Sequence, residues 1–349
     1  MPRKTGYYVS GNTAEGFVNF LSTNTPNFHH HIILKHPSNK IKTAIINEII
    51  KKYETDHDIE VLYSSIGKEY VEGVIIRDKK VAIIDERIAT ADLSGSFEID
   101  LALFISQDIT NIDLSEDLNK VNQLTQKAYD NFETGLKVHD DLEEVYIKEM
   151  NFDAANNLAD DFIETIFKYV PKQNKEASAV HRLFGTNTRD GVVNVVPEIL
   201  SQLSKKYFIK GRAGTGKSTF MKKVMSAAQD HGFDVELYHC SFDPNSADMV
   251  LIRELEFCIF DSTDPHEFFP TGPGEEEIDM YEKTVTPGTD EKYEKEITEI
   301  NTRYKSYMKK GVVELKAAGD IIQKMEQKYT MEPREMEKVI SFISGKIIE

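Results

Sequence analysis

One stretch of this sequence decides the fold: Gly211-Arg212-Ala213-Gly214-Thr215-Gly216-Lys217-Ser218. It follows the apolar segment Tyr207-Phe208-Ile209 and precedes a run with helical spacing of apolar residues. Three glycines let the backbone curl so that successive N–H groups point inward, and the helix that follows adds the partial positive charge of its N-terminus. The stretch therefore predicts an anion-binding turn between a strand and a helix.

The spacing Gly-x-x-x-x-Gly-Lys-Ser in this context is the signature of a nucleotide phosphate-binding loop, or P-loop. In this interpretation Lys217 reaches the β- and γ-phosphates, the Ser218 hydroxyl ligates Mg²⁺, and Thr219 donates to the α-phosphate. Asp261, which ends a later apolar strand, suits the acid that holds the magnesium shell. The alternative is a glycine-rich turn that only caps a helix.

The chain also contains an internal duplication. Residues 12–63 match residues 187–238 without a gap at a shift of 175, with nine identities over 52 positions. Ordinary residue usage would give roughly three identities by chance. After one inserted residue the shift becomes 176, and Asp85 then matches Asp261. One helical stripe of apolar residues repeats in register with these matches: Ile45, Ile46, Ile49, Ile50 and Tyr53 against Phe220, Met221, Val224, Met225 and Ala228.

Each copy has the pattern of an α/β domain. Thr13 or Thr188 is expected to cap a short helix, and a strand, a loop, the striped helix and two further strands follow. Strand, helix, strand order favours parallel strands joined by crossover helices. Each copy ends in a charged tail, at about 110–170 and 290–349, which is expected to be helical.

We therefore predict two tandem P-loop NTPase-type domains, each with a parallel sheet and a helical appendage. Residues 1–175 would form the first domain, with its phosphate site degenerate, and residues 176–349 the second, with its loop intact. A polar stretch near 171–176 suits the linker between them.

The first copy lacks the glycines of the loop. The shift of 175 places Lys42 on Lys217 and Thr43 on Ser218, but it also places His36, Asn39 and Ile41 on the three glycines. Asparagine tolerates a left-handed backbone, whereas the β-branched Ile41 does not. We interpret the first copy as a P-loop fold whose phosphate site has decayed.

An acidic pair, Asp85-Glu86, complicates this interpretation. Many ATPases place a metal acid beside a catalytic glutamate after such a strand. The second copy has Ser262 at the position of Glu86. A composite site, in which Glu86 completes the nucleotide site of the other copy, is one alternative, and ordinary strand-to-loop chemistry is the other.

The roles of three further groups of residues each allow two interpretations. Asp264 and His266 follow the strand acid, where water-orienting and γ-phosphate-sensing groups often lie, but a proline-containing turn with polar caps explains them equally well. The side chain of Arg212 is expected to point outward to solvent or a partner. Arg77 and Arg253 occupy matching positions, which fits a shared structural salt bridge as well as a phosphate contact.

Composition narrows the class of protein. The formal net charge is −17, from 59 acids and 42 bases. Proteins that bind duplex nucleic acid or anionic membrane surfaces need a cationic face, so neither partner is expected. The apolar runs are too short for a membrane span, no signal peptide is evident, and the two cysteines suit a reducing, cytoplasmic compartment.

The loop and the segment Asp261-Ser262-Thr263-Asp264-Pro265-His266, in a chain of two tandem copies, resemble an uncharacterised bacterial family of duplicated P-loop ATPase-like proteins. The resemblance covers nearly the whole chain and implies a fold and a bound nucleotide, but no substrate. In that family a segment similar to Gly-Thr-Ala-Pro-His follows the strand acid, and Ser262 and Asp264 differ from this motif.

We expect ATP, or another NTP, to bind with Mg²⁺ and to be hydrolysed slowly, because this chemistry depends mainly on positioning and charge stabilisation. The expected catalytic side chains are Lys217, Asp261, Asp264 and His266. A kinase for a small molecule or nucleotide and a non-catalytic nucleotide switch remain alternatives. The partner, whether a small-molecule acceptor or a protein, is not specified by the sequence.

Overall fold

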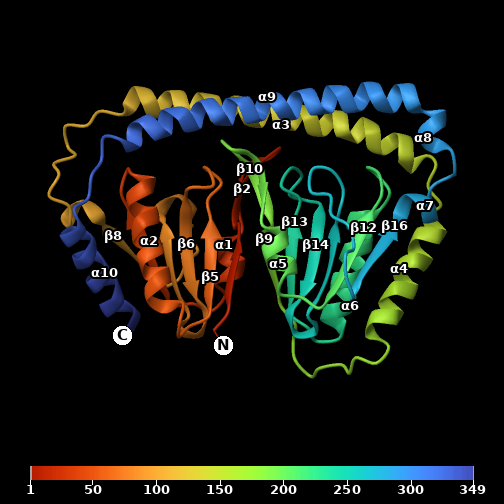
Figure 1. Cartoon of the computed structure of the whole chain (residues 1–349), viewed down its shortest axis with the longest axis horizontal. Coiled ribbons are helices and arrows are strands. Elements are labelled where there is room, and N and C mark those ends of the chain that lie inside the picture. Colours follow the sequence, from red (N-terminus) through yellow and green to blue (C-terminus); the bar gives the residue numbers. More distant parts are fainter. Residues whose placement is uncertain (1, 349) are drawn as a thin grey trace.

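The computed structural model describes residues 2–348 and contains two six-stranded sheets, one in each half of the chain (Figure 1). The first-half sheet has, in spatial order, β1 (Lys4–Tyr7), β5 (Ile59–Tyr63), β6 (Val71–Ile76), β7 (Val81–Asp85), β4 (His30–Lys35) and β8 (Ser96–Asp100). The second-half sheet has β9 (Ala179–Leu183), β13 (Val235–His239), β14 (Ala247–Ile252), β15 (Phe257–Asp261), β12 (Lys205–Lys210) and β16 (Glu275–Asp279). The two orders are the same when equivalent strands are matched, so the predicted duplication is present in the fold.

The sheets are mixed, and the prediction of parallel sheets was wrong in this respect. β6 and β14 run antiparallel to both of their neighbours, while the remaining pairs are parallel. The reason is the length of the connections: β14 joins β15 through the short 3₁₀ turn η4 (Arg253–Leu255), and no α-helix lies between β13 and β14 or between β14 and β15. A tight turn reverses the strand direction, whereas parallel strands need a crossover.

The alignment of the two copies also needs one correction. The same bulge lies between Leu62 and Tyr63 in β5 and between Tyr238 and His239 in β13, so these strands match at a shift of 176. The inserted residue therefore precedes the strands and does not follow them. The corrected shift pairs Glu60 with Glu236, and each binds the matching arginine, Arg77 or Arg253. These arginines thus make the shared structural salt bridge and do not line the cavity described below.

Thr13 and Thr188 do not cap helices. They lie in β-hairpins, formed by β2 (Ser10–Thr13) with β3 (Gly16–Asn19) and by β10 (Gly185–Thr188) with β11 (Gly191–Asn194). Each threonine hydroxyl donates to the carbonyl of the glycine three residues later. Two short helices follow the hairpins, α1 (Leu21–Asn24) and α5 (Val196–Leu200). The local hydrogen bond of a threonine closes a turn as readily as it caps a helix, which explains the error.

The striped helices are α2 (Asn39–Tyr53) and α6 (Lys217–Asp230). Their predicted stripes are buried, apart from Met225, which is partly buried. Short elements complete the two units: α7 (Met280–Thr284), α8 (Thr289–Lys292), and the 3₁₀ turns η1 (Arg77–Lys79), η2 (Glu86–Ile88) and η3 (Leu101–Leu103).

The helical tails cross from one half to the other. The long helices α3 (Ser115–Ile147) and α9 (Glu294–Glu326) pack side by side across the top of both sheets in Figure 1 and run in opposite directions. Beyond them, α4 (Phe152–Phe167) packs on α6 of the second half, and α10 (Pro333–Ile348) packs on α2 of the first. The division at residues 175 and 176 stays a prediction, but each sheet is covered by a helix from the opposite tail.

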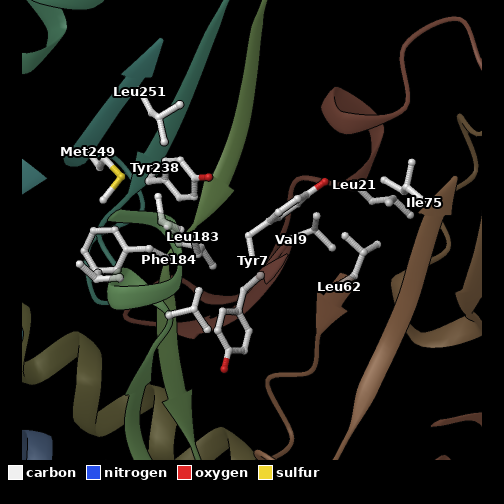
Figure 2. Close-up of a cluster of buried hydrophobic side chains, with 14 of the residues drawn as sticks. Tyr7, Val9, Leu21, Leu62, Ile75, Leu183, Phe184, Tyr238, Met249 and Leu251 are labelled. Carbon is white, nitrogen blue, oxygen red and sulfur yellow. The ribbon is translucent and has the colours of Figure 1, made fainter. Parts of the chain in front are cut away.

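The halves meet through a two-fold arrangement of equivalent residues. Figure 2 shows buried side chains of both halves, among them Tyr7 and Leu183, in one hydrophobic cluster. The backbones of Tyr8 and Leu183, which are equivalent positions, exchange hydrogen bonds of 3.0 and 2.8 Å. Asn12 and Asn187 likewise donate to each other's carbonyl oxygens, at 2.8 and 2.9 Å. The two units therefore have a shared core, in which equivalent groups face each other.

No helix within residues 2–348 is long and apolar enough to cross a membrane.

Candidate functional site

The site is built around the Gly-rich loop, residues Gly211–Gly216, between the end of β12 and the first turn of α6. Gly214 and Gly216 have φ values of +71° and +82°, in the left-handed region that glycine adopts without strain. A Cβ atom at Gly214 would also come within 2.6 Å of the carbonyl oxygen of Glu143 on α3. Both the backbone conformation and the close approach of α3 therefore require glycine at this position.

Lys217 and Asp261 lie beside the loop. Asp261 is the last residue of β15, which pairs in parallel with β12, so the carboxyl ends of both strands meet at one edge of the sheet. The Lys217 Nζ donates to the carbonyl oxygen of Arg212 at 2.8 Å and lies 3.6 Å from Asp261 Oδ2. Both side chains are mostly buried but keep 12% and 14% of their surface exposed, so a ligand can still reach them.

Ser218 occupies the first turn of α6. Its hydroxyl oxygen accepts from the backbone N–H of Ala247 at 2.9 Å, which fixes its position beside the neighbouring strand β14. The equivalent Thr43 makes the corresponding contact with Val71, both donating and accepting at 3.1 Å. Because the Ser218 oxygen has a second lone pair, this contact leaves room for a metal ligand bond. Ser218, Asp261 and Lys217 are the residues that could hold a magnesium ion and phosphate here.

The segment after β15 contains the two other predicted catalytic residues. Asp264 is exposed and forms an ion pair of 3.0 Å with Lys305 on α9. His266 is only 9% exposed, and its Nε2 lies 3.7 Å from Asp248 Oδ2. Burial lowers the pKa of His266, so its ring is neutral near pH 7. The structure thus brings His266 toward the strand acids and directs Asp264 toward α9.

Three residues at the site escaped the sequence interpretation: Asp248, His139 and Glu143. Asp248 is buried on β14, and burial together with the neighbouring Asp261 carboxylate raises its pKa well above the usual value. Its counterpart is Glu72, so an acid in both copies of an apolar strand was a usable signal. His139 and Glu143 come from α3, and nothing in the local sequence places them near a loop some 70 residues later.

These groups surround one cavity of about 1180 Å³. The Gly-rich loop and the start of α6 form its floor, and α3 and α9 cover it. All predicted site residues contribute to its lining: Gly211, Arg212, Ala213, Gly214, Thr215, Gly216, Lys217, Ser218, Thr219, Asp261, Asp264 and His266. Carboxylates outnumber lysine and arginine side chains on its wall. This excess of carboxylates repels a free polyanion, and a divalent cation bound together with a phosphate ligand would reduce that repulsion.

Arg212 does not extend freely into solvent. Its guanidinium pairs with Asp290 of α8 at 2.9 Å and lies over the ring of Tyr281, with its central carbon 4.9 Å from the ring centroid. These contacts connect the Gly-rich loop to α7 and α8. Its side chain is about half exposed, and the partners that it contacts lie within the chain.

The equivalent loop of the first half, residues 36–41, is filled from within the protein. The Glu326 carboxylate, at the end of α9, accepts from the backbone N–H groups of Asn39 and Lys40 at 2.8 and 3.3 Å and from the Ser38 hydroxyl. Lys42 lies 2.9 Å from Asp85, and both are buried. The N–H groups and the lysine that would hold a phosphate therefore already have anionic partners.

Glu86 belongs to this internal network. Its carboxylate accepts from the backbone N–H of His36 at 3.2 Å and lies 3.5 Å from Lys42. Among the described residues, Glu86 is not part of the lining of the second-half cavity. The structure thus gives no geometric support to a composite site completed by Glu86.

Comparisons with protein-family models, with curated proteins and with solved structures find no match for this chain.

Proposed function

We propose that the chain binds Mg·ATP, or another Mg·NTP, at residues 211–219 and hydrolyses it, as a duplicated P-loop ATPase-like protein. One observation carries the proposal: the left-handed glycines, Lys217 and Asp261 converge on a single cavity at the end of β12. Within residues 2–348, no side chain accepts a hydrogen bond from a backbone N–H of the Gly-rich loop, and the N–H of Thr215 donates to the Arg212 carbonyl at 3.4 Å. The donors that a phosphate requires are thus not occupied by a side chain.

The roles follow from the positions. Backbone N–H groups of the loop and the N-terminus of α6 would hold the phosphates, with Thr219 beside the α-phosphate. Lys217 would leave the carbonyl of Arg212 and bridge the β- and γ-phosphates, where its charge stabilises the negative charge that develops as the β–γ bond breaks. Ser218 and Asp261 would hold Mg²⁺, directly or through its water shell.

The test is phosphate release from ATP by the purified chain, with and without Mg²⁺. We expect slow release that needs Mg²⁺ and no added acceptor. The matched control removes the corresponding first-half charges together, as Lys42→Met with Asp85→Asn, since neither residue is part of the cavity. Absence of both binding and release in the folded wild-type protein would refute the proposal.

A kinase is the second candidate, and the size of the cavity favours it. Its volume of about 1180 Å³ exceeds the roughly 300–1000 Å³ of most small-molecule sites, so a nucleotide and a second small molecule fit together. A kinase would release little phosphate without an acceptor, and it would consume ATP when the correct acceptor is added. Binding without any turnover would instead favour a nucleotide-dependent switch.

A further inference from the structure

The second-half cavity has a wall that comes from the first half's tail. Helix α3 leaves the first half and ends over the Gly-rich loop of the second, where the Glu143 backbone touches Gly214. His139 and Glu143 are four residues apart, so they lie on the same face of α3. Both line the cavity, together with Lys217 and Asp261 of the second half.

Glu143 is placed to act on a ligand. Its side chain is 42% exposed while it lines the cavity, and its Oε1 lies 3.7 Å from Nδ1 of His139. The His139 ring is itself held against Tyr304 of α9, at 5.2 Å between ring centroids. The carboxylate therefore has the His139 ring as a neighbour on α3 and is exposed enough for a ligand in the cavity to reach it.

The electrostatics of the pair fit the same position. Burial raises the pKa of Glu143, as do the nearby acids Asp140 and Asp243, while the Lys217 ammonium opposes this change. Burial lowers the pKa of His139, and the charge of Lys217 lowers it further. Both side chains thus sense the charge of Lys217, which in the proposed function marks the place of the β- and γ-phosphates.

The two residues expected from the sequence to orient water are less suited to it. Asp264 also lines the cavity but forms an ion pair with Lys305 of α9, and His266 is buried with its Nε2 toward Asp248. The Asp264 carboxylate thus has a cationic partner, and the His266 Nε2 faces another acid. Glu143 is partly exposed, and its backbone on α3 packs against Gly214 of the loop.

We propose that Glu143 is the general base of the ATPase, supplied across the halves by α3, an inference that rests on the proposed function. A water molecule between Glu143 and the γ-phosphate attacks phosphorus, and its proton passes to the carboxylate. The new P–O bond forms as the bond from the γ-phosphorus to the β–γ bridging oxygen breaks, and the electron pair stays on ADP. The products are ADP, inorganic phosphate and the proton that Glu143 then releases to solvent.

The experiment compares Glu143→Gln with Glu144→Gln. Glu144 is the adjacent residue, is 71% exposed, and pairs with Lys148 outside the cavity, so it controls for a charge change on α3. We expect Glu143→Gln to lower kcat by roughly 100-fold or more, within the range for loss of a general base. The dissociation constant for Mg·ATP, measured by calorimetry, should stay within about threefold, and Glu144→Gln should match the wild type.

Each other outcome overturns the assignment. If kcat is unchanged in Glu143→Gln, or if the wild-type protein binds Mg·ATP without turnover, then Glu143 is not a general base. The proposal that the chain binds nucleotide is not affected by either result. Equal loss of binding and turnover in a variant with wild-type thermal unfolding makes Glu143 a binding residue instead. Wild-type protein that binds no nucleotide at all refutes the proposed function itself, so the two failures are distinguishable.

Discussion

The first-half loop and the Gly-rich loop occupy the same position in the same fold, but their N–H groups have different partners. In the first half, Glu326 from α9 accepts from the loop backbone, and Lys42 is buried against Asp85. In the second half, Lys217 lies 3.6 Å from Asp261 at the edge of a cavity. The first half thus contains its own anions where the second, in our proposal, requires a nucleotide. In our proposal, one fold therefore serves as a structural anchor in one copy and as a ligand site in the other.

The largest effect should come from breaking the internal pair of the first half. Lys42→Ala leaves the buried Asp85 carboxylate without its 2.9 Å partner, and such a loss costs about 3–5 kcal/mol. We expect this decrease in the free energy of unfolding, measured with urea. Lys42→Met combined with Asp85→Asn should recover most of it, with unchanged affinity for Mg·ATP. A loss below about 1 kcal/mol for Lys42→Ala would mean that the pair is not a structural replacement for a ligand.

The corresponding change in the second half should affect binding and not folding. Lys217→Ala removes a charged donor to two phosphates, and hydrogen bonds to charged groups contribute about 1.5–3 kcal/mol each. We expect the affinity for Mg·ATP to fall by roughly 100-fold or more, with little change in thermal unfolding. Lys222→Ala, on the exposed side of the same helix, is the control. A variant that binds as well as the wild type would contradict the assignment of the loop.

The substitution Asp261→Asn tests the proposed metal site of the second half. The neutral amide holds the magnesium shell poorly, but the loop N–H groups still bind phosphate. Turnover with Mg²⁺ should fall by about 10- to 100-fold, while nucleotide binding measured in EDTA should stay within about threefold. Equal losses in a folded variant would show that Asp261 acts only as a structural partner of Lys217.

The smallest effect is expected at Glu326. Glu326→Gln keeps the size of the side chain, but its amide has one acceptor oxygen, so it loses the hydrogen bond to either Asn39 or Lys40 and weakens the other. We expect a loss of about 1–2 kcal/mol in the free energy of unfolding. The first half should not gain a nucleotide site, because Ile41 still prevents a left-handed backbone there. A second nucleotide bound by this variant would show that Glu326 alone had blocked the first-half loop.

The sequence predicted the parts of the fold that depend on local spacing. The strand–loop–helix around Lys217 and the buried stripe of α6 follow from glycine positions and a 3.6-residue period. The antiparallel strands were missed because their turns place Lys80 and Glu256 at φ values of +52° and +47°. Glycine or asparagine at those positions would have indicated a hairpin, whereas charged side chains did not.

Only the parts of the candidate site at the ends of β12 and β15 could be predicted from the sequence. The spacing of the motif residues along the chain indicated the loop, Lys217 and Asp261. Glu143 and Glu326 were not, because the packing of α3 against α9 brings each of them to a loop far away in the chain. A helical period indicates that a helix buries one face, but it does not indicate which half of the molecule that face covers.

The number of nucleotides bound per chain tests the central claim most directly. Calorimetric titration of the wild-type protein with Mg·ATP, or with a nonhydrolysable analogue, should give one site per chain. That site should disappear in Lys217→Ala and persist in the double variant Lys42→Met with Asp85→Asn. Two sites per chain, or loss of the single site in the well-folded double variant, would contradict the account, because the first-half loop would then bind nucleotide or help to complete the site.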